Sequence, residues 1–298
     1  MKKLMFVLAA VLLFAGNAGA VVKETSSSLP SFTMIKISSC FDVTFVESED
    51  CGITISADEA VLDYIVADVK GLQLVLDIET TNMPAEVKKL FRRKDAAPEM
   101  KVVIKAPSAN LSQVTLERKA KLSSCEFQVG NFVFSCTDNA VVQDVSIVSR
   151  YAVNVSFAKR SSGQIKVFTN KLGLDITSSG AVTLEQDVDE SSISVNSGCS
   201  FTLSGDAGKL SYNGKQGAKS KFTGNVDEVT FNCAGTSQTD ATELVCKNAD
   251  VTMNGLCTLK VAPTEKLEIN IGGGATLEYS GKPEIDIVSI KTSSVKKN

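Results

Sequence analysis

From Val114 onward, hydrophobic and polar residues alternate in short segments that recur along the chain. Each segment has an apolar-polar-apolar triplet, then Asn or Ser, a turn of small residues and a second alternating strand. The triplets begin at Val114, Phe132, Val153, Leu174, Ile193, Leu210, Val229, Val251 and Leu267. Their mean spacing of about 19 residues is typical of solenoids, and alternation with period two predicts strands rather than helices. The pattern predicts an all-β protein built as a right-handed parallel β-solenoid, or β-helix, whose inward side chains fill the coil.

An asparagine follows the second apolar residue of the triplet in five of these coils. The five are Asn196, Asn213, Asn232, Asn254 and Asn270. Asn tolerates the left-handed backbone of a turn, and its amide can hydrogen-bond to the amide of an Asn one strand away, at about 4.8 Å. We therefore expect a structural ladder of stacked Asn side chains. A row of Asn that binds a ligand is the alternative.

The stretch before the repeat is strand-rich but less regular. Strands are expected at Phe32–Ile37, Phe41–Val46, Ile53–Ile55, Leu72–Ile78 and Lys101–Ile104. Apolar residues at helical spacing predict a helix over Glu59–Val69, and a second helix is expected over Ala85–Arg93, entered through Pro84. We expect these short helices to cover the N-terminal end of the solenoid.

The first 20 residues have the features of a secretory signal peptide. Lys2 and Lys3 precede an apolar run from Leu4 to Phe14, and Ala18-Gly19-Ala20 matches a cleavage site. The run is too short for a permanent membrane span, so we expect an exported protein in the periplasm, on the cell surface or outside the cell. The expected division is a signal peptide at 1–20, a linker at 21–30, an N-terminal β-rich part with helical insertions at 31–110, regular coils at 111–290 and a polar tail at 291–298.

Composition excludes several classes of function. The 298 residues include 31 Lys and Arg, 34 Asp and Glu, and neither His nor Trp, for a net charge of −3. A slightly acidic chain without a basic domain is unsuited to electrostatic nucleic-acid binding. Without His there is no His-dependent triad, no imidazole base and no mixed Cys/His zinc site. We expect no cofactor, no metal and no nucleic-acid partner.

Eight cysteines in an exported chain raise the question of disulfides. Three pairs are spaced 11 residues apart, namely Cys40/Cys51, Cys125/Cys136 and Cys246/Cys257. However, five cysteines lie two residues from an inward Phe or Leu, where a small buried thiol would fill the core. These five are Cys125, Cys136, Cys199, Cys233 and Cys257. We expect most of the thiols to be buried and free, with Cys40–Cys51 as the possible disulfide.

Two charged segments are candidates for binding. The basic segment consists of Lys88, Lys89, Arg92, Arg93 and Lys94. It is a possible site for an anionic partner such as a lipid head group or an acidic polysaccharide, or else the solvated face of a short helix. Asp187, Asp189 and Glu190 lie together and could hold Ca²⁺, but they lack the register of calcium-binding solenoids, which favours a solvated loop.

The order of N-terminal segments resembles a known family. The segments are Phe32-x-x-Ile35-x-Ile37, Phe41-Asp42-Val43-Thr44-Phe45, Ile53-Thr54-Ile55-Ser56-Ala57-Asp58, Leu62-x-x-Ile65 and Gly71-Leu72-x-Leu74, followed by the Ser-, Gly- and Asn-rich repeats. They resemble the head GIN domain family of mainly exported bacterial proteins labelled auto-transporter adhesins. The resemblance spans nearly the whole mature chain and implies a β-solenoid with an adhesin-like role. Cys40 and Cys51 depart from its usual residues, and Met83–Pro98 looks like an insertion.

Three functions are compatible with these observations. The first is a non-catalytic interaction protein that presents a repetitive polar surface to a surface glycan or a protein. The second is a carbohydrate-active β-helix enzyme, a polysaccharide lyase or hydrolase, which would need paired carboxylates or a Ca²⁺, Lys and Arg cluster beside sugar-stacking aromatics. Aromatic residues make up only 6% of the chain, and Tyr212 and Tyr279 fall in inward positions, which disfavours sugar binding and, with it, an enzyme. The third is a structural envelope protein that associates end to end or along an edge. We favour the first.

Overall fold

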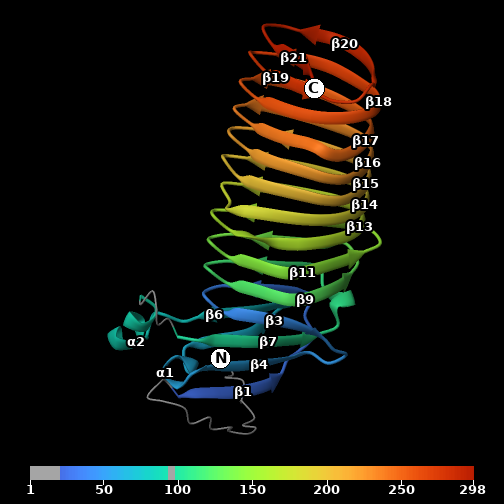
Figure 1. The fold of residues 1–298 in the computed structure, drawn as a ribbon. Coiled ribbons are helices and arrows are strands. Elements are labelled where there is room, and N and C mark those ends of the chain that lie inside the picture. Colours follow the sequence, from blue (N-terminus) through green and yellow to red (C-terminus); the bar gives the residue numbers. More distant parts are fainter. Residues whose placement is uncertain (1–20, 93–97) are drawn as a thin grey trace.

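The computed structural model describes residues 21–92 and 98–298 and shows a β-solenoid of about ten turns with coils of about 19 residues. Strands make up 69% of the chain, and the two α-helices of the described residues are short (Figure 1). The predicted fold class and coil length are confirmed. The predicted signal peptide at 1–20 lies outside the described residues. No described helix is long and apolar enough to cross a membrane.

The N-terminal part combines strands with the two short helices. Its elements are β1 (Val22–Ser28), β2 (Met34–Ile37), β3 (Asp42–Glu47), β4 (Gly52–Asp58), α1 (Glu59–Leu62), β5 (Ile65–Lys70), β6 (Gln73–Ile78), α2 (Ala85–Leu90), β7 (Met100–Ala106) and the 3-10 helix η1 (Ser108–Asn110). Strand β4 pairs antiparallel with β1 and with β7, and β5 forms an antiparallel hairpin with β6. Strands β2 and β3 pair in parallel with β8 and β9, so this part continues directly into the regular coils.

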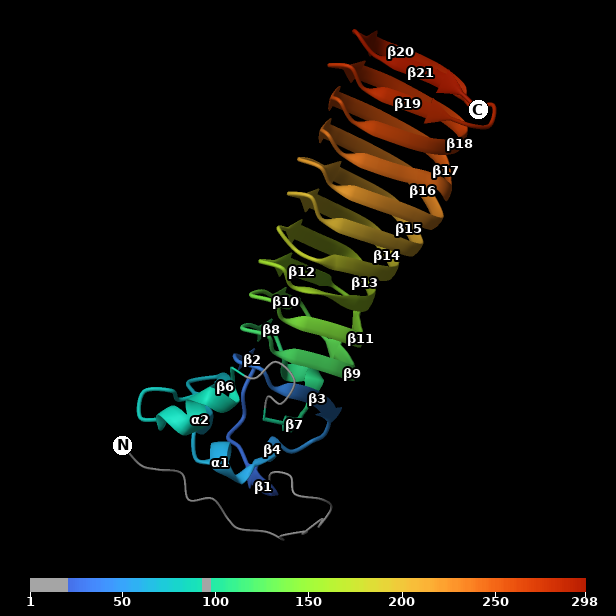
Figure 2. The same ribbon diagram turned by 60° about the vertical axis from the view of Figure 1, so that its left-hand side comes forward.

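The regular coils follow as parallel strands stacked along an elongated axis (Figure 2). They are β8 (Gln113–Leu116), β9 (Lys121–Val129), β10 (Phe132–Cys136), β11 (Val141–Ser149), β12 (Ala152–Ala158), β13 (Ser162–Thr177), β14 (Ala181–Asn196), β15 (Ser200–Gly214), β16 (Lys219–Gly235), β17 (Gln238–Gly255), β18 (Thr258–Gly272), β19 (Thr276–Tyr279), β20 (Glu284–Ile290) and β21 (Ser294–Lys297). Each of β13 to β18 bends in the middle, so that one strand supplies two sides of its coil. Leu174 lies opposite Ile193, which lies opposite Tyr212, and this spacing is the 19-residue repeat.

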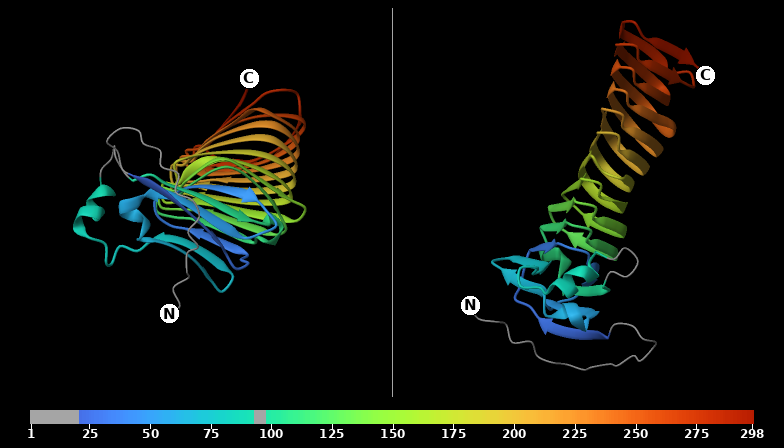
Figure 3. Two further views of the ribbon diagram at one scale, coloured as in Figure 1. Left: turned by 90° about the horizontal axis from the view of Figure 1, so that it is seen from below. Right: turned by 90° about the vertical axis from the view of Figure 1, so that its left-hand side faces the viewer.

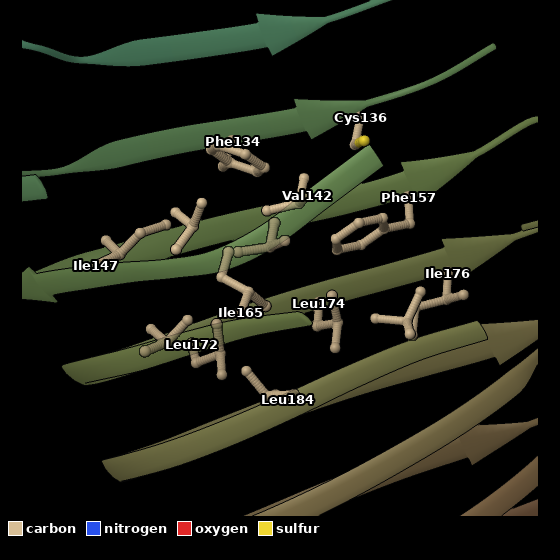
Figure 4. Close-up of a cluster of buried hydrophobic side chains, with 14 of the residues drawn as sticks. Phe134, Cys136, Val142, Ile147, Phe157, Ile165, Leu172, Leu174, Ile176 and Leu184 are labelled. Atoms are coloured by element: carbon tan, nitrogen blue, oxygen red, sulfur yellow. The ribbon is translucent and has the colours of Figure 1, made fainter. Parts of the chain in front are cut away.

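The core is a column of apolar side chains inside the coil. Alternate residues of each strand point inward, and Figure 4 shows Phe134, Phe157, Leu174 and Leu184 from successive coils packed together. Further along, the ring of Phe222 meets the rings of Phe201, Tyr212 and Phe231 at centroid distances of 5.9, 4.9 and 5.6 Å. Since burying one large apolar side chain contributes roughly 2–3 kcal/mol, this continuous column is the main source of stability.

Several predicted boundaries were wrong. Residues 21–30 were expected to form a linker, but 22–28 form strand β1, and the expected polar tail contains strand β21, paired with β19. The helix expected over Glu59–Val69 ends at Leu62, and β5 follows because it pairs along its length with β6. The helix over Ala85–Arg93 ends at Leu90. For β1, β21 and β5, pairing with another strand outweighs the local pattern. Figure 3 shows both helices beside the N-terminal strands.

Candidate functional site

The five asparagines do not form the single ladder that was predicted. Asn213 lies opposite Asn232, and the same row continues through Thr252 to Asn270. Asn196 and Asn254 belong to another row, two residues further along, where Asn196 lies opposite Thr177 and Asn254 opposite Ala234 and Gly272.

The reason for the error lies in two small residues of an inward row. Leu210, Val229 and Leu267 all occupy this row, but in two coils its members are Ser191 and Ala249. Because Ser191 and Ala249 are not large apolar residues, the triplets of these two coils were counted from Ile193 and Val251. Each count therefore starts two residues after the position that Leu210, Val229 and Leu267 occupy in their own coils. Only the Asn213–Asn232 pair has the adjacency that a ladder requires.

Cys40 and Cys51 are both free, so the proposed disulfide is absent. Strand β7 gives the reason. This strand pairs with β3 and with β4. Asp42, two residues after Cys40, lies opposite Lys101 of β7, whereas Gly52, the residue after Cys51, lies opposite Lys105. Four residues of extended strand span about 13 Å, and a disulfide needs Cα atoms within about 7 Å. The two thiols therefore lie near opposite ends of β3, too far apart for a disulfide, although their spacing in the sequence equals that of the other two pairs.

The other six cysteines are free and buried, which confirms the interpretation of five of them as core residues and adds Cys246 to the core. Burial raises the pKa of the Cys125, Cys136 and Cys233 thiols to about 12, and that of Cys246 to about 11. Such thiols stay protonated at neutral pH and are poor nucleophiles.

The basic segment is only partly described. Lys88 and Lys89 lie on α2 and Arg92 lies just beyond it, while Arg93 and Lys94 are outside the described residues. Lys89 pairs with Glu86 on the same helix at 2.9 Å, and both side chains are mostly exposed. The segment is therefore a solvated helix face in its described part, and its role in binding an anionic partner stays a prediction.

A groove of about 600 Å³ crosses the second half of several coils. We name it the serine groove and define it by two rows of outward residues. Its floor is the row Asn154, Gly173, Ser192, Ser211 and Thr230, and its side is the row Lys171, Glu190, Lys209 and Glu228. Each residue lies opposite its neighbour in the row, about 4.8 Å away, so the floor offers one small polar side chain per coil except at Gly173.

The side of the serine groove is a ladder of alternating charge. Lys171 pairs with Glu190 at 3.1 Å and Lys209 pairs with Glu228 at 2.9 Å. The hydrogen bond to Glu228 raises the pKa of Lys209, with a smaller contribution from Glu190. On the floor, in the described part of the chain, no side-chain hydrogen bond engages the hydroxyls of Ser192, Ser211 or Thr230, which leaves them available to a ligand. Tyr151, 63% exposed, precedes the lining residue Ala152.

A second groove, of about 580 Å³, crosses the first half of the coils near the C-terminal end. We name it the lysine groove. Its charged and amide side chains are Lys219, Lys221, Gln238, Asp240, Lys260 and Glu278. Lys221 pairs with Glu243 at 2.8 Å and Lys260 with Glu278 at 3.3 Å, so these cations are partly neutralised. A hydrogen bond from Thr242 lowers the pKa of Asp240.

The acidic residues considered as a calcium site lie at the bend of the coils. Asp187 lies opposite Asp206, whose Oδ1 accepts hydrogen bonds from the backbone N and the side-chain Nδ2 of Asn225, at 3.0 and 2.9 Å. Glu190 belongs instead to the charge ladder. No group of three or more potential metal ligands occurs within residues 21–92 and 98–298. The bend is a polar surface formed by residues of neighbouring coils.

Comparison with known proteins gives a family match over most of the chain. A family model described as "putative auto-transporter adhesin, head GIN domain" matches residues 31–283. Solved structures with a similar chain include a "putative adhesin" from Parabacteroides merdae (17% identity, TM-score 0.45) and a "putative lipid binding protein" from Parabacteroides distasonis (18% identity, TM-score 0.44). Each match covers 93% of this chain and 96% of the other. None of the curated proteins compared matches the chain.

Proposed function

The chain belongs to the head GIN domain family of "putative auto-transporter adhesins", and from this premise we propose that it is an exported, non-catalytic interaction protein whose serine groove binds a surface glycan. The predicted signal peptide supports export to the periplasm, the cell surface or the outside of the cell. The observation that carries the glycan assignment is the row of free hydroxyls at Ser192, Ser211 and Thr230, bordered by an ordered ladder of Lys and Glu.

The mechanism follows from the repeat. A rigid coil holds the hydroxyls of Ser192, Ser211 and Thr230 at a fixed interval, so a chain-like ligand with repeated hydroxyl groups can form hydrogen bonds to several coils at once. Each bond is weak, but consecutive bonds within one ligand act at high effective concentration. Lys171 and Lys209 donate hydrogen bonds, Glu190 and Glu228 accept them, and the exposed ring of Tyr151 offers a flat apolar surface near one end.

The experiment is a glycan and extracellular-matrix array with the mature chain from Val21, at low and moderate salt. Ser211→Trp places a large ring on the floor of the groove and is expected to abolish binding, whereas Ser28→Trp, at an exposed position of β1, is the matched control and should leave binding intact. Tyr151→Ala should weaken binding without affecting the fold.

Three outcomes would contradict the proposal. Binding that survives Ser211→Trp but is lost in the Lys219→Glu, Lys221→Glu double variant would move the site to the lysine groove. Release of shortened glycan products by the purified protein would make it the carbohydrate-active enzyme considered as the alternative. Selective binding to matrix proteins alone would replace the glycan with a protein partner.

A further inference from the structure

The last coil of the solenoid exposes side chains of the core. Ile285 and Ile287 lie opposite Leu267 and Ile269, which are buried. In the last coil, however, Ile285 is 40% exposed, Ile287 57% and Ile290 41%. Within residues 21–92 and 98–298, β20 pairs only with β18 and β21 only with β19, so each also has an unpaired edge. An edge that combines apolar side chains with free backbone groups is a template for pairing with another chain.

The two strands of this coil carry opposite charge on their outward faces. Glu284 and Asp286 of β20 continue the outward rows of Lys266 and Glu268, while Lys296 of β21 continues the row of Glu278. The two halves of a coil face each other across the core, as the contact between Tyr212 and Phe222 shows, and the chain reverses direction between them. The last coil therefore presents an acidic edge strand and a basic one, running in opposite directions.

We infer that this coil is the contact between two copies of the chain, joined end to end about a two-fold axis with β20 of each copy paired antiparallel to β21 of the other. Two head-to-head arrangements give antiparallel pairs. Pairing β20 with β20 brings the carboxylates Glu284 and Asp286 of both copies to one outward face. Pairing β20 with β21 places Asp286 opposite Lys296 of the second copy.

The alternation of inward and outward residues along each strand then determines which inward side chains meet in this pair. In an antiparallel pair, Asp286 opposite Lys296 of the second copy puts Ile287 opposite Val295, and both belong to inward rows. The same contact thus joins opposite charges outside and apolar side chains inside, and it satisfies the free backbone groups of both edges. Because the symmetric pair uses both edges of both copies, it closes at two and does not grow into a fibre.

Other features of the coil restrict pairing to a defined register. The ladder between β18 and β20 is shifted between Ile269 and Asn270, which leaves Val288 without a direct partner, and Lys297 stands in the row of the half-buried Tyr279. Bulges and inward charges of this kind prevent indiscriminate edge pairing. In the proposed dimer, the stem of Lys297 covers Ile285 of the second copy and its ammonium reaches solvent.

Sedimentation velocity of the mature chain, over a range of concentrations, tests the inference. We expect a dimer. Ile287→Lys should raise the dissociation constant about thirty-fold or more, the effect of a central interface residue. Val245→Lys is the matched control, since Val245 is equally exposed at 57% but lies on an interior coil, and it should not change the constant. Circular dichroism verifies the fold of each variant.

Charge exchange tests the arrangement itself. Asp286→Lys and Lys296→Glu alone should each weaken the dimer about ten-fold, and the double variant should restore it. In a mixture of ¹⁴N- and ¹⁵N-labelled protein, carbodiimide should yield a cross-link between Asp286 of one copy and Lys296 of the other. A monomer at all concentrations, growth beyond a dimer, or a dimer indifferent to Lys296→Glu would each overturn the inference. Glycan binding is measured separately, so failure of one proposal leaves the other intact.

Discussion

The N-terminal end of the solenoid is covered by a polar strand, whereas the C-terminal end presents an apolar one. At the N-terminal end, β1 pairs with β4 and carries Lys, Glu, Thr and Ser, and Phe32 and Val61 are buried beneath the surrounding segments. At the C-terminal end, Ile285 and Ile287 occupy core rows but are largely exposed. The same inward row is thus buried or exposed according to whether another coil lies above it.

This difference indicates where stability resides. In a repeat protein each coil is stabilised mainly by its two neighbours, so interior coils gain from both sides and the last coil from one. We therefore expect perturbations of the interior to be costly and perturbations of the C-terminal coil to matter chiefly for association.

Alkaline pH should destabilise the interior coils. Desolvation raises the pKa of Cys125, Cys136, Cys233 and Tyr212 to about 12 and that of Cys246 to about 11, all away from the two ends. In the unfolded chain thiols ionise near pH 9 and Tyr near 10. The folded state therefore binds more protons, and stability that is complete below about pH 9 falls as the pH rises toward 12.

Urea unfolding at pH 8 and pH 10, under reducing conditions, measures this loss. Each buried thiol should cost roughly 1 kcal/mol between pH 9 and 10. Cys136→Ala should remove one group's share of the pH dependence. A free energy of unfolding that is equal at pH 8 and pH 10 would show that the interior thiols ionise freely, and the contrast between interior and ends would lose this support.

Core truncation should separate interior from end most directly. Phe222→Ala removes a fully buried ring that contacts three other aromatic rings and should cost about 3–5 kcal/mol. Ile287→Ala removes a side chain from the equivalent core column at the exposed end and, in a sample dilute enough to be monomeric, should cost under about 1 kcal/mol. If chemical denaturation showed equal losses of unfolding free energy for the two variants, the side chain of Ile287 would have to be as well buried as that of Phe222.

Glycine replacement compares the interior with the N-terminal part. Gly224 has φ +115°, and an added Cβ would lie 2.0 Å from the carbonyl oxygen of Gly205 in the preceding coil. Gly71, in the β5–β6 hairpin, has φ +63° and open space around it. Gly224→Ala should therefore cost roughly 3 kcal/mol from strain and clash together, and Gly71→Ala roughly 1 kcal/mol from conformation alone. Thermal unfolding of both variants would contradict this if Gly71→Ala proved the more harmful.

The sequence was sufficient to predict the structure of a single coil, but it did not show which residues of adjacent coils lie opposite each other. Alternation of inward residues such as Phe201 and Leu203 was sufficient to predict strands, period and core. Rows across coils depend on which residue lies opposite which, and a small inward residue such as Ser191 displaced the count by two positions. For this reason the Asn ladder was predicted wrongly, and the serine groove, which exists only as a set of aligned rows, was not predicted.

The N-terminal part of the chain was also poorly predicted by the pattern of apolar and polar residues. Strand β1 reads as a polar linker because its strand character comes from pairing with β4, 24 or more residues away. Strand β5 reads as a helix because its apolar residues also fit helical spacing, and only the hairpin with β6 decides between the two. The thiols Cys40 and Cys51 looked like a pair because spacing in sequence carries no information on which end of β3 each one occupies.

The smallest effect is expected from the charge ladder on the interior coils. Lys209→Met removes the cation between Glu190 and Glu228, but the side chain of Lys209 is 65% exposed and its ion pair is screened by solvent. We expect a slight fall in Tm at low salt that disappears at high salt, because ions weaken exposed pairs. Lys215→Met, at an exposed position outside the ladder, is the control and should not respond to salt. If Lys209→Met destabilised the protein as much as Phe222→Ala, surface charge rather than burial would distinguish the interior from the ends, and the contrast drawn from the core would be wrong.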